Sequence, residues 1–375
     1  MSPEQSKKIF YIDNLRVGLI TLVVIQHALI TYGVDGAWYY AQKTTLSGAL
    51  VPMTLLAIIN QSFFMGLFFF LSAFFIPGSY NKKGVARFVK ERLIRLGIPL
   101  VFYSFILSPV LIWLVYYFGQ GHHISFMQFL SDFHDWIDFG VLWFVAALLL
   151  FTLVYVLWRM LNKNYSSKLI KPPTSRKIFV FASVVGIMSF LVRIAFPIGW
   201  ILKPVGFQLA YFSQYVALFI LGLVASKNHW LDEFPFDRGK RFARYAPRLL
   251  IFLLVISIIE KVARPPMSWF TGGFHWQQLL YAVWEQLLGF SIIVALLTYG
   301  KKLWNKSSPL MGKLSRNAFA VYIFHPLVLI VLSLSLRNWS VDPAIKFLVV
   351  APMGVAGSFL LAFVITSIPG VSKII

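Results

Sequence analysis

Cysteine is absent from this chain of 375 residues. The absence excludes a disulfide framework, thiolate metal ligands and a cysteine acyl-enzyme. Charged residues are also scarce, at 13% of the chain, and Asp and Glu together number only 13. A chain with so little charge and with 59% hydrophobic residues cannot be a soluble globule. The composition therefore indicates a polytopic membrane protein.

Apolar runs of membrane-spanning length recur along the whole chain. Because about 17–25 apolar residues make one span, we expect an all-α fold with ten transmembrane helices. The expected spans are 14–33, 51–77, 96–118, 140–158, 178–197, 208–226, 247–263, 279–299, 317–336 and 345–368. The connecting segments are short, so residues 1–375 are expected to form a single integral-membrane domain. The first run lacks a cleavage site and is expected to remain as the first span.

The basic residues indicate the orientation of these spans. With the N-terminus inside, most of the 34 Lys and Arg residues fall in inner segments, as cytoplasmic loops require. An even number of spans then places both termini in the cytoplasm. The net charge of +21 is explained by this topology and by contact with anionic membrane lipids, so no nucleic-acid partner is expected. We expect a multi-pass protein of the cell (cytoplasmic) membrane.

The first span carries two ionisable residues. Arg16 and His27 are eleven positions apart, so on an α-helix they face the same way, about 16 Å apart along the axis. Arg16 is expected at the cytoplasmic headgroups and His27 near the middle of the bilayer. An ionisable side chain at that depth is a candidate functional residue. The alternative is a snorkelling arginine and a histidine that hydrogen-bonds a neighbouring helix.

A second embedded histidine favours a functional site. His325 follows Arg316 by nine residues in a span that also begins at the cytoplasmic side, so both histidines are expected at a similar depth. Pro326 directly after it leaves backbone groups that need another partner. The five remaining histidines are expected in loops or near the outer surface; they are His122, His123, His134, His229 and His275. No metal site is expected.

A basic cluster lies between the second and third spans. Arg87, Lys90, Arg92 and Arg95 recur at near-helical spacing before Pro99, which predicts a basic helix at the cytoplasmic membrane surface. Arginine suits a ligand with several phosphates because it donates two parallel hydrogen bonds to one phosphate. Anchoring to lipid headgroups is the alternative.

Together these motifs resemble the membrane-bound acyltransferase 3 family over essentially the whole chain. The resemblance rests on 11–16 (YIDNLR) with the ten-residue gap to His27, on 68–75 (FFFLSAFF), on the run from Arg92 to Pro99, on 142–144 (LWF) and on 322–327 (YIFHPL). Two departures stand out. Ala73 replaces a usual glycine, and Val145 to Phe151 lacks a glutamate that many members carry, as in the branch related to glucan succinyl- and acetyltransferases.

The resemblance implies an O-acyltransferase that transfers groups other than aminoacyl groups. It implies acetyl-CoA, or another acyl-CoA such as succinyl-CoA, as donor, and a hydroxyl of a glycan or lipid-linked saccharide as acceptor. It also marks Arg16 and His27 as an essential pair.

A mechanistic hypothesis follows from these residues and the family together. Arg92 and Arg95 with Arg16 would hold the coenzyme phosphates, and His27 would act as general base. His325 would orient the acceptor or relay the proton. Glu285 and Glu260 are candidate carboxylate partners, but solvation at the outer interface is the favoured role for each.

A transporter or polysaccharide exporter is the alternative function, because embedded His and Arg also line substrate and proton paths. Against it, the chain shows no pair of matching interrupted helices in two halves, and the inner basic clusters suit a phosphate-bearing donor from the cytosol.

Overall fold

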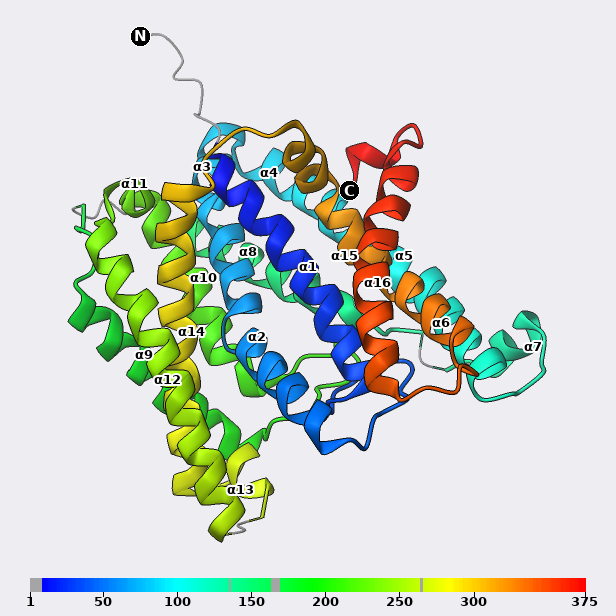
Figure 1. Cartoon of the computed structure of the whole chain (residues 1–375). Coiled ribbons are helices and arrows are strands. Elements are labelled where there is room, and N and C mark those ends of the chain that lie inside the picture. Colours follow the sequence, from blue (N-terminus) through cyan, green and yellow to red (C-terminus); the bar gives the residue numbers. More distant parts are fainter. Residues whose placement is uncertain (1–8, 135, 163–168, 264–265) are drawn as a thin grey trace.

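The computed structural model describes residues 9–134, 136–162, 169–263 and 266–375, with only the backbone described for residues 254–263. The described part of the chain is helical, and its only β-type pairing is an isolated bridge between Leu202 and Phe207. Figure 1 shows long helices packed side by side in one bundle. The expected all-α polytopic fold is confirmed.

Nine helices of the described residues are long and apolar enough to cross a membrane. They are α1 (Phe10–Tyr32), α2 with α3 (Ser47–Phe74 and Ile76–Lys83), the continuous run of α4, α5 and α6 (Val85–Arg92, Ile98–Phe102 and Ser108–Leu114), α8 (Trp143–Leu161), α9 (Ser175–Ala195), α10 (Phe212–Lys227), α14 (Trp276–Leu303), α15 (Pro309–Ser335) and α16 (Pro343–Thr366). Short helices complete the chain: α7 (Phe126–Ser131), α11 (Trp230–Glu233) and α13 (Ser268–Thr271). Each of the nine corresponds to one predicted span.

The remaining predicted span, 247–263, corresponds to α12 (Phe236–Ala263). This helix packs along α14. On the residues that the structure describes, it is not among the nine helices that are long and apolar enough to cross a membrane. Its first turns are basic and polar, so its apolar part is short in the described side chains. Figure 1 shows it crossing the bundle beside α9 and α14. The tenth span therefore stays a prediction.

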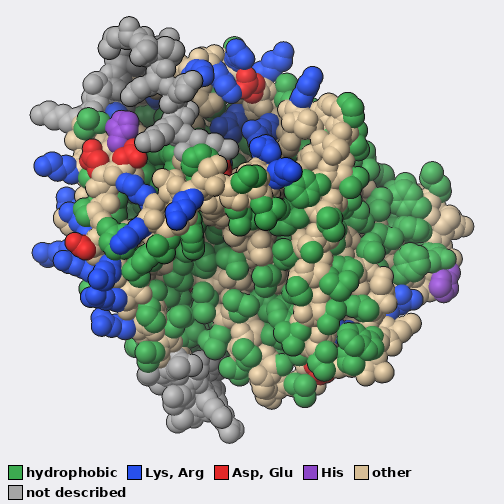
Figure 2. Space-filling view, turned by 45° about the horizontal axis from the view of Figure 1, so that its top comes forward, with side chains coloured by type: hydrophobic (Ala, Val, Ile, Leu, Met, Phe, Trp, Pro, Cys, Tyr) green, Lys and Arg blue, Asp and Glu red, His purple; other side chains and the backbone are tan. Residues whose placement is uncertain are grey.

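The two ends of the described chain lie at the same end of the bundle. Figure 1 shows α1 beginning at the top, and the C-terminus lies there as well. Figure 2, turned to bring that end forward, shows Lys and Arg gathered along it, whereas hydrophobic side chains cover the middle. By the rule that inner loops are basic, this is the end expected in the cytoplasm; we call it the basic end and the opposite one the outer end.

Small residues let the central helices approach closely. A Cβ at Gly289 of α14 would overlap the backbone oxygen of Ser62 in α2, and a Cβ at Gly222 of α10 would overlap that of Phe70. Close backbone approach through small residues is a main source of helix association in membranes, where lipid is as apolar as the side chains. Around this centre α1 packs against α2, α15 and α16.

The predicted basic helix is the first part of a longer rod. It runs from Val85 to Gly119 and contains three π-helical turns, of which the first, Leu93–Gly97, includes Arg95. A π-turn adds a residue to the helical repeat and so shifts the face that later residues share. Arg87, Lys90 and Arg95 are exposed, whereas Arg92 is partly buried.

Candidate active site

Two histidines from opposite ends of the sequence meet inside the bundle. Nε2 of His325 in α15 lies 3.0 Å from Nδ1 of His27 in α1, and the ring centroids are 5.0 Å apart. His325 is fully buried and His27 partly so. The expectation of similar depth is confirmed. His27 lies five residues from the outer end of α1 and not at its middle, so the pair sits in the outer half of that helix.

Pro326 determines which nitrogen of His325 carries the proton. Proline has no N–H, so the carbonyl of Tyr322, four residues earlier, lacks its helical donor. Nδ1 of His325 lies 2.9 Å from that carbonyl oxygen and 3.3 Å from that of Val321. A carbonyl only accepts, so Nδ1 of a neutral His325 is the donor and Nε2 is left as an acceptor.

The tautomer of His325 fixes that of His27. Because Nε2 of His325 accepts, Nδ1 of His27 donates the hydrogen bond between the two rings. The lone pair of a neutral His27 therefore lies on Nε2. A nucleophile-activating base whose other nitrogen is held by an orienting group is the general pattern of such sites. Here the orienting group is an imidazole.

Trp38 covers the histidine pair from the outer side. It belongs to the segment 33–46 that joins α1 to α2, and its ring stacks on His27 with centroids 4.3 Å apart and planes 19° apart. It lies 6.2 Å from the His325 ring in a similar orientation. Stacking of this kind fixes the plane of the His27 imidazole and shields it from solvent.

A cluster of hydroxyls beside Trp38 surrounds the carboxylate of Asp138. The hydroxyls of Tyr39 and Tyr103 are 2.7 Å apart, and Ser108 donates to the Asp138 carboxylate over 3.3 Å. Burial, together with the Asp138 charge, raises the pKa of Tyr39 above its usual range, so its hydroxyl stays a donor at neutral pH. A Cβ at Gly140 would overlap the Tyr39 hydroxyl, which explains a glycine there, at a φ of 42°.

Hydrogen bonds join the segment 33–46, which carries Trp38, to α16. Lys346, which is 1% exposed, donates to Oε1 of Gln42 and to the carbonyl of Arg337, each over 3.0 Å. Thr44 donates over 2.7 Å to Asp342, which also caps the N-terminus of α16. These bonds hold the segment that carries Trp38 in place against the bundle.

The predicted arginines gather at the basic end, away from the histidines. The charge of Arg95 acts on both Arg16 and Arg92, so Arg95 lies within electrostatic reach of each. Arg16 also contacts Asp13 over 3.4 Å and lies 5.0 Å from the Phe75 ring. Eleven residues of α1 separate it from His27, about 16 Å along the axis. The arginines and the histidines thus lie near opposite ends of α1.

The role favoured for Glu285 is wrong. Glu285 is 1% exposed and pairs over 2.5 Å with Arg193, which is fully buried in α9. Arg193 also donates to the carbonyl of Ala210 over 3.1 Å. Two opposite charges at similar depth pair inside the bundle because neither tolerates lipid alone. Glu285 contacts neither histidine, and the side chain of Glu260 lies outside the described residues.

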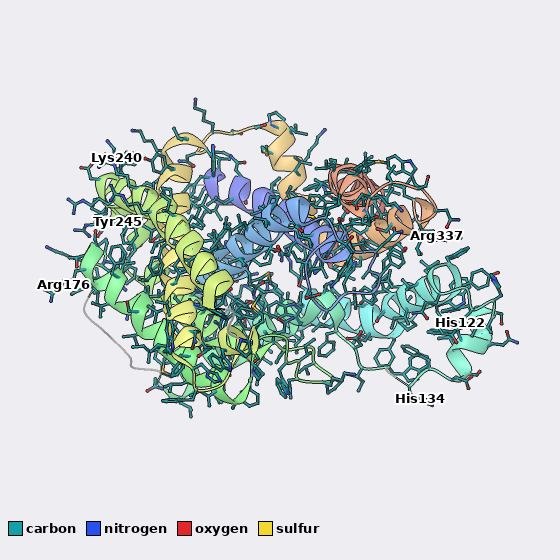
Figure 3. The ribbon with its side chains drawn as sticks, turned by 60° about the horizontal axis from the view of Figure 1, so that its bottom comes forward. His122, His134, Arg176, Lys240, Tyr245 and Arg337 are labelled. Carbon is teal, nitrogen blue, oxygen red and sulfur yellow. The ribbon has the colours of Figure 1, made fainter. Side chains whose placement is uncertain are left out.

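The other expected loop histidines stay away from this site. His122 and His134 are exposed beside α6 and α7, at the right of Figure 3, and His122 stacks on Tyr116. No group of three or more His, Asp or Glu that could hold a metal occurs in the part of the chain that the structure describes. Within those residues, no carboxylate reaches either embedded imidazole.

Three residues of this arrangement are missing from the sequence-based prediction. Trp38 and Asp138 lie in connecting segments, where periodicity carries no signal. Arg193 was detectable, because it and Glu285 are isolated charges inside two apolar runs and at the same expected depth. Opposite charges so placed predict a pair.

The fold is that of a polytopic membrane protein with two hydrogen-bonded imidazoles inside its helical bundle. The sequence matches the acyltransferase 3 family, described as an acyltransferase domain, over residues 9–366, and the chain belongs to this family. It is an O-acyltransferase. Family membership therefore favours the transferase over the transporter alternative.

The chain is distantly similar to proteins of glucan biosynthesis. The chain is 22% identical over 343 residues to glucans biosynthesis protein C of Escherichia coli O1:K1, covering 88% of this chain and 84% of the relative. The protein of the same name from strain K12 is 22% identical over 340 residues, with the same coverage. No solved structure matches the chain significantly.

Proposed function

We propose that this protein transfers an acyl group, acetyl or succinyl, from acyl-CoA to a hydroxyl of a glycan, with His27 as general base. The observation that carries the proposal is the hydrogen bond from Nδ1 of His27 to Nε2 of His325. It leaves the lone pair of His27 on Nε2, where a hydroxyl proton can be taken up. The name of the Escherichia coli relatives supports a glucan-like acceptor.

In the proposed reaction, Nε2 of His27 removes the proton of the acceptor hydroxyl as the oxygen attacks the thioester carbonyl carbon. The carbon–sulfur bond then breaks, and the coenzyme thiolate receives the proton that His27 holds. His325 stabilises the imidazolium by accepting from its Nδ1–H, which is the orienting role a carboxylate has in a hydrolytic triad.

The arginines at the basic end are proposed to bind the coenzyme. Arg16, Arg92 and Arg95 place three positive charges together, and guanidinium groups bind phosphates through paired hydrogen bonds. Their distance from His27 requires the donor to place its phosphates at the basic end and extend its thioester along α1. Coenzyme A has a long flexible arm between its phosphates and its thiol, which suits this spacing.

The test is transfer of label from acetyl-CoA and from succinyl-CoA into the glycan and lipid fractions of membranes. Wild type, His27→Ala and the control His122→Ala are compared at equal protein levels. We expect label in a glycan fraction with the wild type and the control, and none with His27→Ala. Equal transfer by His27→Ala would refute His27 as the base, and transfer from neither donor would refute acyl-CoA as the substrate.

A further inference from the structure

A large apolar cavity lies apart from the histidines and from the arginine cluster. Its volume is about 650 Å³, within the range of small-molecule sites. Side chains of α9, α10 and α14 form its wall, and α11 covers it at the basic end. Neither the histidine pair nor the arginine cluster contributes to its lining.

The mouth of this cavity carries three lysines. Lys177, Lys301 and Lys302 line it, and the lining contains no Asp or Glu. Lys301 is engaged with the carbonyls of Leu231 and Asp232 at 2.9 and 2.6 Å. Lys302 lies 4.1 Å from the centre of the Phe236 ring, and neither it nor Lys177 forms an ion pair within the described residues.

Further basic residues lie next to residues of the cavity lining, such as Lys177, Pro173 and Phe236. Arg176 on α9 and Lys240 on α12 lie on the same side of the bundle in Figure 3. Arg238 donates to the carbonyls of Pro172 and Pro173. These charges outweigh the nearby acidic residues of the same end, which are Asp232, Glu233 and Asp237. The mouth is therefore suited to an anionic group.

The depth of the cavity matches one leaflet of a bilayer. Its lining on α14 extends from Phe290 to Lys302, a separation of twelve residue steps or about 18 Å along the helix axis. Half of a hydrocarbon core of about 30 Å is close to that length. Below the lysines the wall is made of side chains such as Phe181, Leu218 and Ile293, which offer nothing to a polar ligand.

We propose that this cavity binds an anionic phospholipid of the leaflet at the basic end, with its phosphate at Lys177 and Lys302 and an acyl chain among α9, α10 and α14. Trp230 at the mouth is fixed by donating from its indole to the carbonyl of Ile170 over 2.7 Å, at the level where interfacial tryptophans lie. The site is independent of the proposed acyl transfer.

The test titrates the delipidated, detergent-purified protein with phosphatidylglycerol or phosphatidylcholine of identical chains and counts bound lipid by native mass spectrometry. We expect one phosphatidylglycerol to bind at least tenfold more tightly than phosphatidylcholine. Lys177→Gln with Lys302→Gln should weaken phosphatidylglycerol about 10- to 30-fold, since each basic residue near a headgroup contributes roughly fivefold, and should leave phosphatidylcholine unchanged. Lys82→Gln with Lys306→Gln is the matched control, because both lysines are exposed at the same end and lie outside the cavity.

Two further measurements test whether the bound lipid occupies this cavity. Ala225 lines the cavity and is fully buried, so Ala225→Phe should abolish tight binding. Phosphatidylglycerol brominated on its chains should quench the wild type more than Trp230→Phe. Equal affinity for the two lipids, no effect of the lysine pair, displacement by palmitoyl-CoA at equal concentration, or identical quenching in Trp230→Phe would each overturn the proposal.

Discussion

His27 is oriented by His325, whose own proton is fixed by the carbonyl that Pro326 leaves free. Nδ1 of His27 lies 3.0 Å from Nε2 of His325, and Nδ1 of His325 lies 2.9 Å from the Tyr322 oxygen. In the proposed reaction, a neutral imidazole thus takes the position in which a carboxylate orients the base of a hydrolytic triad. A neutral group suits the interior of a membrane protein, because an ionised carboxylate there needs a dedicated partner.

The two histidines are expected to act as one unit. His27→Ala should lower kcat by roughly 10²–10⁴-fold, the usual contribution of a general base. His325→Ala should lower kcat less, and the double variant should be no slower than His27→Ala, because residues that act together give non-additive losses. Label transfer from acyl-CoA at saturating substrate measures this, and losses that multiply in the double variant would contradict it.

The arginine cluster is expected to act on donor binding and not on chemistry. Arg92→Ala with Arg95→Ala should raise KM for acyl-CoA by roughly tenfold per arginine, with little change in kcat, since each removes a charge-assisted hydrogen bond to phosphate. Arg87→Ala is the control, because Arg87 is exposed and pairs with Glu91 over 3.0 Å.

A truncated donor distinguishes phosphate binding from general damage. Acyl-pantetheine lacks the nucleotide phosphates, so its KM should be the same for the wild type and the double arginine variant. An equal rise in KM for both donors would show that the arginines do not contact the phosphates.

Trp38 is expected to position the His27 ring. An aromatic stacking pair contributes about 0.5–1.5 kcal/mol, so Trp38→Ala should lower kcat about 2- to 10-fold, and Trp38→Phe should retain most of the rate. Trp143→Phe serves as a comparison, because Trp143 stacks on Tyr215 and not on a histidine. If Trp38→Phe and Trp38→Ala are equally slow, stacking is not the reason for the loss.

The pair of Arg193 and Glu285 is expected to stabilise the fold. Glu285→Gln leaves a buried guanidinium without its counter-charge, which should destabilise the protein by about 3–5 kcal/mol. Unfolding of the detergent-solubilised protein measures the loss. Replacing both partners, as Arg193→Met with Glu285→Leu, should recover much of it, because no unpaired charge remains.

A surface pair provides the comparison for that experiment. Glu91→Gln breaks the contacts of an exposed carboxylate with Lys83 and Arg87, and it should hardly change stability because solvent screens such pairs. A loss as large as that of Glu285→Gln would show that burial is not what makes the inner pair important.

Sequence periodicity was sufficient for the properties that depend on single helices. The length of apolar runs predicted the spans, and the eleven-residue spacing of Arg16 and His27 predicted their common stripe on α1. Pro326 predicted a free carbonyl beside His325, because a missing N–H is a local property. The π-turn at Leu93–Gly97, which contains Arg95, was not predictable in this way.

The sequence by itself determined that this is a membrane protein, where its spans lie and that two histidines occur at similar depth, because hydropathy and helical rise are properties of each segment. Only the tertiary structure decided that His27 contacts His325 across 298 residues, that Trp38 covers them and that Arg193 pairs with Glu285. In lipid, the apolar surface of a helix does not determine which other helix packs against it. The pairing of helices depends on close packing at small residues and on polar partners, which only the assembled helices bring together.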